Sequence, residues 1–210
     1  MADFNLIYPT IVKYEGYYVN DPKDPGGETY MGIARNYNKT WQGWQIIDQY
    51  KAAHGGTIPY NTKIENSTLD NLVKERAQQY FNAMRGGEIN NLAIATIAAQ
   101  LFWGSASGIK RVVQQAAINL GAKITPDNVI GNNTINALNT LPQAPLYAEI
   151  RRLYINYIDY LGKGQPEYAI GWKNRLNYVL SLTDKWISNN GIPIFGILLG
   201  SLFIYLAVKN

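Results

Sequence analysis

The stretch that decides the fold spans residues 15–33 and reads EGYYVNDPKDPGGETYMGI. Two Asp-Pro pairs and a Gly-Gly pair lie at its centre. They favour tight turns, because proline fixes φ while glycine accepts the left-handed region. Aromatic and β-branched residues flank these turns, which predicts short strands at 17–19 and 30–33. We therefore expect a small β-hairpin here.

The rest of the chain is predicted to be mainly helical. Apolar residues three to four positions apart predict an opening helix from Phe4, with Asp3 as its N-cap and Pro9 as an interruption. Similar spacing predicts helices at 44–53, 67–84, 92–104, 108–120, 132–139, 145–161 and 168–187, the second of these capped by Asn66 or Ser67. The Thr-Pro-Asp-Asn cluster in the loop 121–131 breaks this periodicity and predicts a joint between two subdomains.

The composition restricts the chemistry. The 210 residues include no cysteine, and His54 is the one histidine, so a disulfide framework, a thiol nucleophile and Cys-based zinc sites are excluded. Multi-histidine zinc sites and Ser-His-Asp triads within the chain are excluded or strained. What remains for hydrolysis is carboxylate chemistry, and we expect neither a cofactor nor a metal.

The charge is unevenly distributed. Residues 1–105 hold 9 basic and 10 acidic side chains, whereas residues 106–210 hold 10 basic and 5 acidic ones. A basic second half favours an anionic partner such as a cell wall or a membrane surface. No dense Lys/Arg run occurs, so we expect no nucleic-acid partner.

Glu15 is the candidate acid. Glycosidic bond cleavage needs a protonated carboxyl near the leaving oxygen and a second group, or a water, on the other face of the sugar. Glu15 lies at the predicted end of the opening helix, and Gly16 beside it leaves room for a sugar ring. Asp21, Asp24 and Glu28 supply further carboxylates on the following turn.

At nearly every position, residues 15–33 resemble the signature of glycoside hydrolase family 108, approximately E-G-G-Y-x-N-D-P-x-D-P-G-G-x-T-x-x-G-I. That family comprises lysozyme-like N-acetylmuramidases of phages and prophages, including secretion activator proteins. Residues 116–120, 127–138 and 171–176 are similar to its C-terminal peptidoglycan-binding domain. The resemblance implies a lysozyme-like α+β domain at 1–105 and a helical peptidoglycan-binding subdomain at 106–188. It leaves out residues 189–210, which we expect to form a separate apolar helix.

The resemblance also implies roles for individual residues. Glu15 matches the catalytic glutamate, the general acid for the bond between N-acetylmuramic acid and N-acetylglucosamine. Asp21 and Asp24 are candidates for a second carboxylate, and the Thr29 hydroxyl for orienting a water or Glu15; whether the reaction retains or inverts stays open. The candidate substrate-binding residues are Tyr17, where the family has a glycine, together with Tyr18, Gly26, Gly27, Trp41 and Trp44, although core packing is the alternative for the tryptophans.

Residues 191–208 form an uncharged, almost wholly apolar run. As a helix at about 1.5 Å per residue it would extend roughly 27 Å, close to the ~30 Å hydrocarbon core of a bilayer. We expect a C-terminal membrane anchor, with a buried helix as the alternative. Gly196 and Gly200 form a G-x-x-x-G pair that would bring two such helices together as a dimer.

The sequence thus predicts a phage or prophage endolysin, hence an antimicrobial, wall-lysing enzyme, tethered to the membrane of the host bacterium and acting on its peptidoglycan. Two other classes of protein fit the same residues. One is a non-catalytic peptidoglycan-binding module in which Tyr17 has disabled turnover. The other is a wall-penetrating structural component of a virion or a secretion machine, with the apolar run packed inside the assembly.

Overall fold

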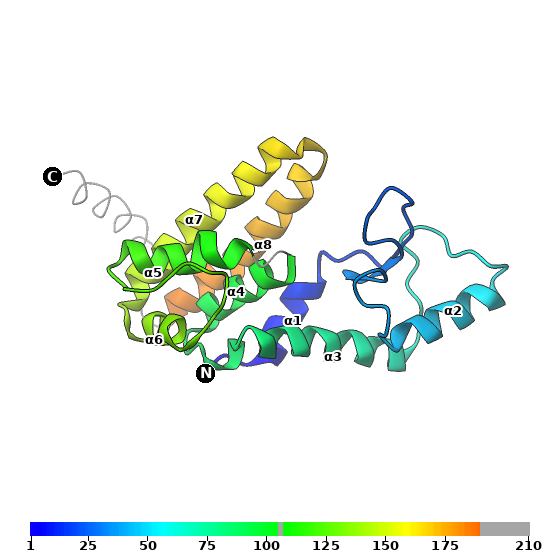
Figure 1. Ribbon diagram of the computed structural model, residues 1–210, viewed down its shortest axis with the longest axis horizontal. Helices are drawn as coiled ribbons and strands as arrows, with labels where there is room; N and C mark the ends of the chain where they lie inside the picture. Colours follow the sequence, from blue (N-terminus) through cyan, green and yellow to red (C-terminus); the bar gives the residue numbers. More distant parts are fainter. Residues whose placement is uncertain (105–106, 190–210) are drawn as a thin grey trace. The chain divides into compact units, whose positions relative to one another are not determined.

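The structure is a computed structural model that describes residues 1–104 and 107–189. The described residues divide into two compact units, one formed by Tyr8–Gln79 and the other by Met1–Ile7 together with residues 80–104 and 107–189. Both boundaries fall inside helices, α1 (Phe4–Val12) and α3 (Ser67–Ala83), which Figure 1 labels. The fold is mainly helical with one small sheet, as the sequence predicts.

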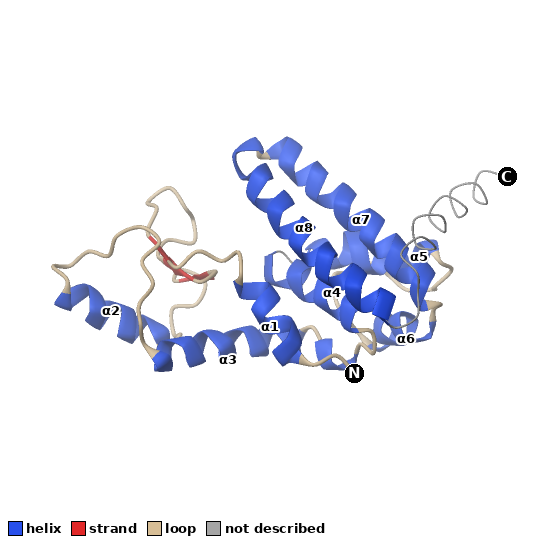
Figure 2. Cartoon of the chain, turned by 180° about the vertical axis from the view of Figure 1, so that it is seen from behind, coloured by secondary structure: helices blue, strands red, loops and turns tan. Residues whose placement is uncertain are grey.

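The sheet lies in the unit Tyr8–Gln79 and is drawn in red in Figure 2. Its strands β1 (Tyr18–Val19), β2 (Thr29–Tyr30) and β3 (Ile33–Ala34) pair antiparallel in that order. Tyr30 pairs with Tyr18 on one side and with Ile33 on the other. The two residues between β2 and β3 have positive φ, 46° at Met31 and 79° at Gly32, as in a type I′ hairpin turn.

This turn corrects one prediction. A single strand at 30–33 is wrong, because those residues end β2, turn, and begin β3. The alternation of apolar residues there resembles a strand, but Gly32 supplies the left-handed position that a two-residue turn requires. The strand predicted at 17–19 is confirmed as β1.

Two helices complete the unit Tyr8–Gln79. Helix α2 (Gly43–Ala53) buries Trp44 and Ile47, and α3 buries its stripe of Leu69, Val73 and Ala77. The Asn66 side chain caps α3, because its Oδ1 accepts a hydrogen bond from the Leu69 N–H at 2.9 Å. Helix α1 contains Pro9 and begins at the predicted cap, where Asp3 Oδ1 accepts from the Asn5 N–H at 2.9 Å.

The second unit is a helical assembly. It contains η1 (Gly86–Glu88), α4 (Leu92–Gly104), η2 (Ile109–Gln114), α5 (Gln115–Asn119), α6 (Asn132–Thr140), α7 (Gln143–Gly164) and α8 (Pro166–Asn189). Helices α7 and α8 lie side by side, and α4 packs against α8 (Figures 1 and 2). Residues 93–101 of α4 are all buried, so α4 is the central helix of this unit. The sequence places α4 in the predicted catalytic domain 1–105, but in the structure it packs with the helices that follow it. The domain boundary at residue 105 therefore stays a prediction.

The segment after α4 also differs from its prediction. Instead of one α-helix over 108–120, Ile109–Gln114 is π-helical and α5 follows it. The loop 121–131, predicted to join two subdomains, lies within this one unit. It is tied to the buried Gln114, whose Oε1 accepts hydrogen bonds from the Asp127 and Asn128 N–H groups, each at 3.0 Å.

Within residues 1–104 and 107–189, no helix has the length and apolar character needed to cross a membrane. The predicted membrane anchor at 191–208, with Gly196 and Gly200, lies outside the residues that the structure describes. The anchor and the dimer therefore stay predictions.

Candidate active site

Glu15 lies just after α1, where the chain turns toward β1. Its N–H donates to the Val12 carbonyl at 3.1 Å, and the residue is half-buried. Two residues later, the Tyr17 N–H donates to Asn61 Oδ1 at 3.0 Å, and the Tyr17 carbonyl accepts from the Met31 N–H at 3.3 Å. The backbone that follows Glu15 is therefore held both by the 61–62 segment and by the hairpin turn.

Asn61 is a candidate positioning residue that the sequence did not reveal. Its φ of 59° places it in the left-handed region, its N–H donates to the Tyr18 carbonyl at 2.7 Å, and its side chain accepts from Tyr17. Asparagine is among the few residues other than glycine that tolerate this backbone conformation. The signal in the sequence was an asparagine directly after Pro59-Tyr60, a turn pattern that reveals a bend but not its distant partner.

Glu28 is a carboxylate with three charged or hydroxyl partners. Tyr18 Oη and Lys51 Nζ each donate a hydrogen bond to its Oε1, and Arg35 Nε lies 2.9 Å from its Oε2. Burial alone would raise the pKa of Glu28, but the hydrogen bonds from Lys51 and Tyr18 and the charge of Arg35 hold that pKa below its ordinary value. These contacts therefore favour the ionised form of Glu28.

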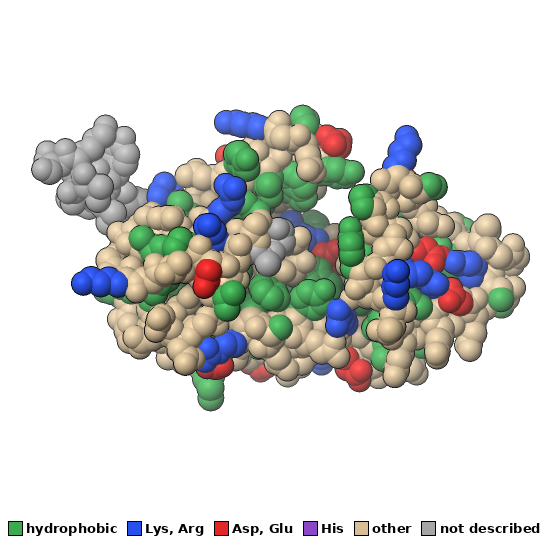
Figure 3. Space-filling view, in the orientation of Figure 1, with side chains coloured by type: hydrophobic (Ala, Val, Ile, Leu, Met, Phe, Trp, Pro, Cys, Tyr) green, Lys and Arg blue, Asp and Glu red, His purple; other side chains and the backbone are tan. Residues whose placement is uncertain are grey.

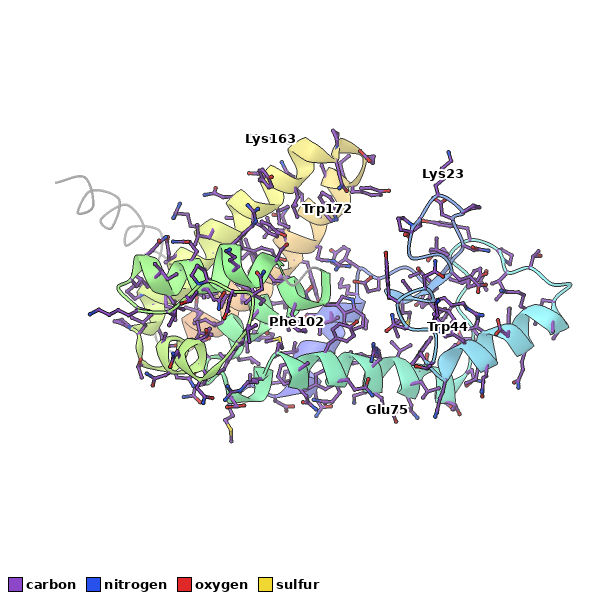
Figure 4. The ribbon with its side chains drawn as sticks, in the orientation of Figure 1. Lys23, Trp44, Glu75, Phe102, Lys163 and Trp172 are labelled. Atoms are coloured by element: carbon purple, nitrogen blue, oxygen red, sulfur yellow. The ribbon has the colours of Figure 1, made fainter. Side chains whose placement is uncertain are left out.

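The aspartates of the loop 20–28 shape its turns. Asp21 Oδ1 accepts from the Lys23 N–H at 2.9 Å, and Asp24 Oδ1 accepts from the Gly26 N–H at 2.7 Å. Both are Asx turns, in which a carboxylate bonds the backbone two residues ahead. Both aspartates are exposed, and Lys23 projects outward between them at the tip of the loop (Figure 4).

Gly26, Gly27 and Thr29 carry the loop back into the sheet. A Cβ on Gly26 would lie 2.9 Å from Ala34 Cβ, and one on Gly27, whose φ is +67°, would lie 2.9 Å from Asn36 Nδ2. The Thr29 hydroxyl donates to the Gly27 carbonyl at 3.2 Å. Close packing and backbone conformation are therefore enough to explain both glycines. The Thr29 hydroxyl uses its hydrogen in this contact, and its oxygen can still accept a hydrogen bond.

The four predicted aromatic contacts separate into two kinds. Tyr18 is 2% exposed with its hydroxyl on Glu28, and Trp44 is 4% exposed with its indole N–H donating to the Asn38 carbonyl at 2.8 Å. These two rings therefore pack in the core of this unit, and a role for them in substrate binding stays a prediction. Tyr17 and Trp41 are half-buried and retain accessible area.

Trp41 lines a groove of about 540 Å³ between the β3–α2 loop and α3, and this groove is a second candidate site in the same unit. None of Glu15, Asp21, Asp24 and Thr29 lines it. In the parts of the chain that the structure describes, no group of three or more His, Cys, Asp or Glu side chains is arranged to hold a metal ion.

In the other unit, residues 127–138, which resemble part of a peptidoglycan-binding domain, are hydrogen-bonded to Gln114. Gln114 Nε2 donates to Asp127 Oδ1 at 2.8 Å and to the Val129 carbonyl at 3.0 Å, and it lies 3.3 Å from Thr134 Oγ1. The hydrogen bond from Gln114 lowers the pKa of Asp127. Asp127 and Thr134 therefore have a structural reason to be present, and wall binding by this element stays a prediction.

Comparison with known proteins identifies a family match in the first half of the chain. A family model described as Glycosyl hydrolase 108 matches residues 8–105, which include the whole stretch 15–33. Among solved structures, that of SagA from Brucella abortus is similar, with a TM-score of 0.59 and 20% sequence identity, covering 87% of this chain and 94% of that chain. At that identity the likeness shows the fold alone. A comparison with curated protein sequences finds no significant match.

Proposed function

Residues 8–105 belong to the glycosyl hydrolase 108 family, and from this premise we propose that the protein is a peptidoglycan hydrolase. The bond that we propose it cleaves is the β-1,4 linkage from N-acetylmuramic acid to N-acetylglucosamine, with Glu15 as general acid. The observation that carries the proposal is the family match over a segment in which Glu15 opens the signature stretch.

The roles of the neighbouring carboxylates support this choice of acid. Glu28 is ionised by its contacts with Lys51, Tyr18 and Arg35, and a carboxylate cannot donate a proton to a leaving oxygen. Asp21 and Asp24 are exposed and engaged in Asx turns. Glu15 is half-buried, and the backbone after it is anchored, which suits a group that must meet a sugar at a fixed place.

In this mechanism, Glu15 protonates the glycosidic oxygen as the bond to the muramic acid C1 breaks, and positive charge develops on that sugar ring. A second carboxylate about 5 Å from Glu15 would form a covalent intermediate and retain the configuration; a water activated by a carboxylate about 6.5–9.5 Å away would invert it. Asp21 and Asp24 are the candidates for the carboxylate, and the Thr29 hydroxyl for placing the water.

The experiment is mass spectrometry of purified peptidoglycan digested by the full-length protein. We expect muropeptides with muramic acid at the new reducing end. Glucosamine at that end would mean a glucosaminidase, and a 1,6-anhydro product would mean a lytic transglycosylase, so either result contradicts the proposed bond. Proton NMR of the new anomeric centre, recorded during digestion and before mutarotation, then distinguishes retention from inversion.

We further propose that the enzyme acts on the cell wall while its apolar run 191–208 tethers it to the membrane of the host bacterium. The support is the length and uncharged character of that run, preceded by Lys185 and Trp186, which are residue types that anchor helices at membrane interfaces. Full-length protein should pellet with phospholipid vesicles, and protein ending at residue 189 should stay in the supernatant. Equal partitioning of the two would contradict the tether.

A further inference from the structure

The groove between the β3–α2 loop and α3 is built from two local elements of the unit Tyr8–Gln79. One wall is a single face of α3, formed by Leu72, Glu75, Arg76 and Gln79; Leu72 and Gln79 each lie three or four residues from Glu75 and Arg76. The other wall is the loop from Asn36 to Gln42. Figure 4 labels Glu75 on the α3 wall, and Trp44 at the start of α2, directly after the loop wall.

Hydrogen bonds and packing fix the lining in place. Arg76 donates to Asn38 Oδ1 and, at 2.8 Å, to Gln79 Oε1, so the guanidinium joins the loop to the helix. The Trp41 indole N–H donates to the Leu72 carbonyl at 3.4 Å, and the Trp41 ring meets that of Trp44 edge-on with centroids 5.1 Å apart. A lining held in this way loses little conformational freedom when a ligand enters.

The chemistry of the lining suits a neutral polar ligand with apolar faces. Tyr37 is 72% exposed at the rim and Trp41 is half-buried, so both offer ring surface. The Gln42 amide is exposed and makes no capping hydrogen bond to α2, although it occupies the N-cap position. Amides both donate and accept, as the hydroxyl and N-acetyl groups of amino sugars require, and aromatic rings pack against the C–H faces of a pyranose.

Charge argues against the other ligand classes. The lining carries two cations, Lys39 and Arg76, and one anion, Glu75, and Arg76 is already engaged with Asn38 and Gln79. A nucleic-acid groove would need a strongly basic track. On the face shown in Figure 3, Lys and Arg side chains are scattered among acidic and uncharged ones. The groove volume, about 540 Å³, is in the range of sites for small ligands.

We infer that this groove is a second glycan-binding site, which takes an N-acetylated amino-sugar chain and holds a wall strand apart from the bond being cleaved. The inference depends on the proposed function in one respect, which is that the bound glycan belongs to peptidoglycan. Tyr37 and Trp41 supply stacking surfaces, and Gln42 supplies an amide that hydrogen-bonds the sugar substituents.

The test uses the full-length Glu15→Gln variant, to prevent turnover, and the tetramer of β-1,4-linked N-acetylglucosamine as the probe. Titration followed by ¹H–¹⁵N NMR should shift the indole resonance of Trp41, which identifies the groove. Tyr37→Ala should weaken this binding about tenfold, the loss expected when one stacked aromatic is removed. Tyr60→Ala is the matched control, because Tyr60 is 81% exposed in the same unit and lies outside the groove; its affinity should equal that of the parent.

Gln42→Ala removes a second side chain of the lining. It should weaken tetramer binding, measured from the same Trp41 resonance. The inference is overturned if the Trp41 resonance stays unmoved at millimolar tetramer, or if Tyr37→Ala and Tyr60→Ala bind alike. A shift caused by an isolated stem peptide but not by the sugar tetramer also overturns it. Because binding is read without hydrolysis, a bound tetramer with no wall digestion by the unmutated protein would refute the proposed function and leave the groove standing.

Discussion

Arg35 Nε lies 2.9 Å from Glu28 Oε2, and the same guanidinium pairs with Asp48 on α2 at 2.7 and 3.2 Å. Glu28 directly precedes β2 and Arg35 directly follows β3, so this contact closes the base of the hairpin and ties it to α2. The Arg35 guanidinium carbon also lies 4.5 Å from the centroid of the Trp44 ring. A carboxylate in the signature stretch thus holds the scaffold together instead of taking part in the proposed chemistry.

Glu28→Gln should destabilise the protein by about 2–3 kcal/mol, because it removes the more buried of the two carboxylates that face Lys51 and Arg35; the Glu28 side chain is only 10% exposed, and the Asp48 side chain is 51% exposed. Urea unfolding monitored by tryptophan fluorescence measures the change. Glu65→Gln is the control, since the Glu65 side chain is 76% exposed and should matter little. Equal effects of the two substitutions would refute the role given to Glu28.

The same ion cluster predicts a pH dependence. The pKa of folded Glu28 is lowered, so its contribution to stability is present above the unfolded pKa of about 4.3 and is lost as the pH falls through the lower folded pKa. The stability difference between the parent and Glu28→Gln should therefore be constant from about pH 7 to pH 5 and shrink below about pH 4. A difference that grows on acidification would contradict this sign.

Gly27→Ala should destabilise the loop more than Gly55→Ala. Both glycines have positive φ, +67° and +76°, so alanine at either position costs about 1–2 kcal/mol of backbone strain. Only at Gly27 does the new Cβ also meet another atom, Asn36 Nδ2 at 2.9 Å, whereas nothing lies within 4 Å at Gly55. The difference between the two melting temperatures isolates the clash, and the absence of a difference would show that the loop moves aside freely.

Local chemistry made part of this fold predictable. The Asp-Pro and Gly-Gly pairs act within a few residues, so the turns and β1 follow from the sequence, and so do the caps at Asp3 and Asn66. The hairpin turn at Met31-Gly32 is also a local feature. It was not predicted because Met31 has a φ of 46°, a conformation that methionine rarely adopts.

Contacts between distant segments were not predictable in this way. Lys51 meets Glu28 across 23 residues, and Asn61 meets Tyr17 across 44. Which side chains face each other over such separations depends on how α2 and the 61–62 segment pack, and periodicity carries no information about that. Trp44 shows the same limit, because its place in the sequence fits both sugar stacking and core packing, and only the fold shows that its ring is buried.

Asn61 should act as a positioning residue for the segment that follows Glu15. Asn61→Gly accepts the left-handed φ but removes the oxygen that receives the Tyr17 N–H, so we expect a folded protein whose rate of wall hydrolysis falls about tenfold. Asn61→Asp keeps both that oxygen and tolerance of the conformation, and should restore most of the rate. If the glycine and aspartate variants have equal rates, the hydrogen bond to Tyr17 does not position Glu15.

Glu15→Gln should abolish wall clearing on zymograms and lower the rate of sacculus hydrolysis by at least about 10²-fold, because the amide cannot give a proton to the leaving oxygen. The side chain is half-buried and the substitution preserves its size, so the urea midpoint should change little. Glu65→Gln, in the same unit and at an exposed position, should clear at the parental rate. Parental clearing by Glu15→Gln with an unchanged urea midpoint would remove Glu15 from the mechanism, and the search for the acid would then turn to Asp21 and Asp24.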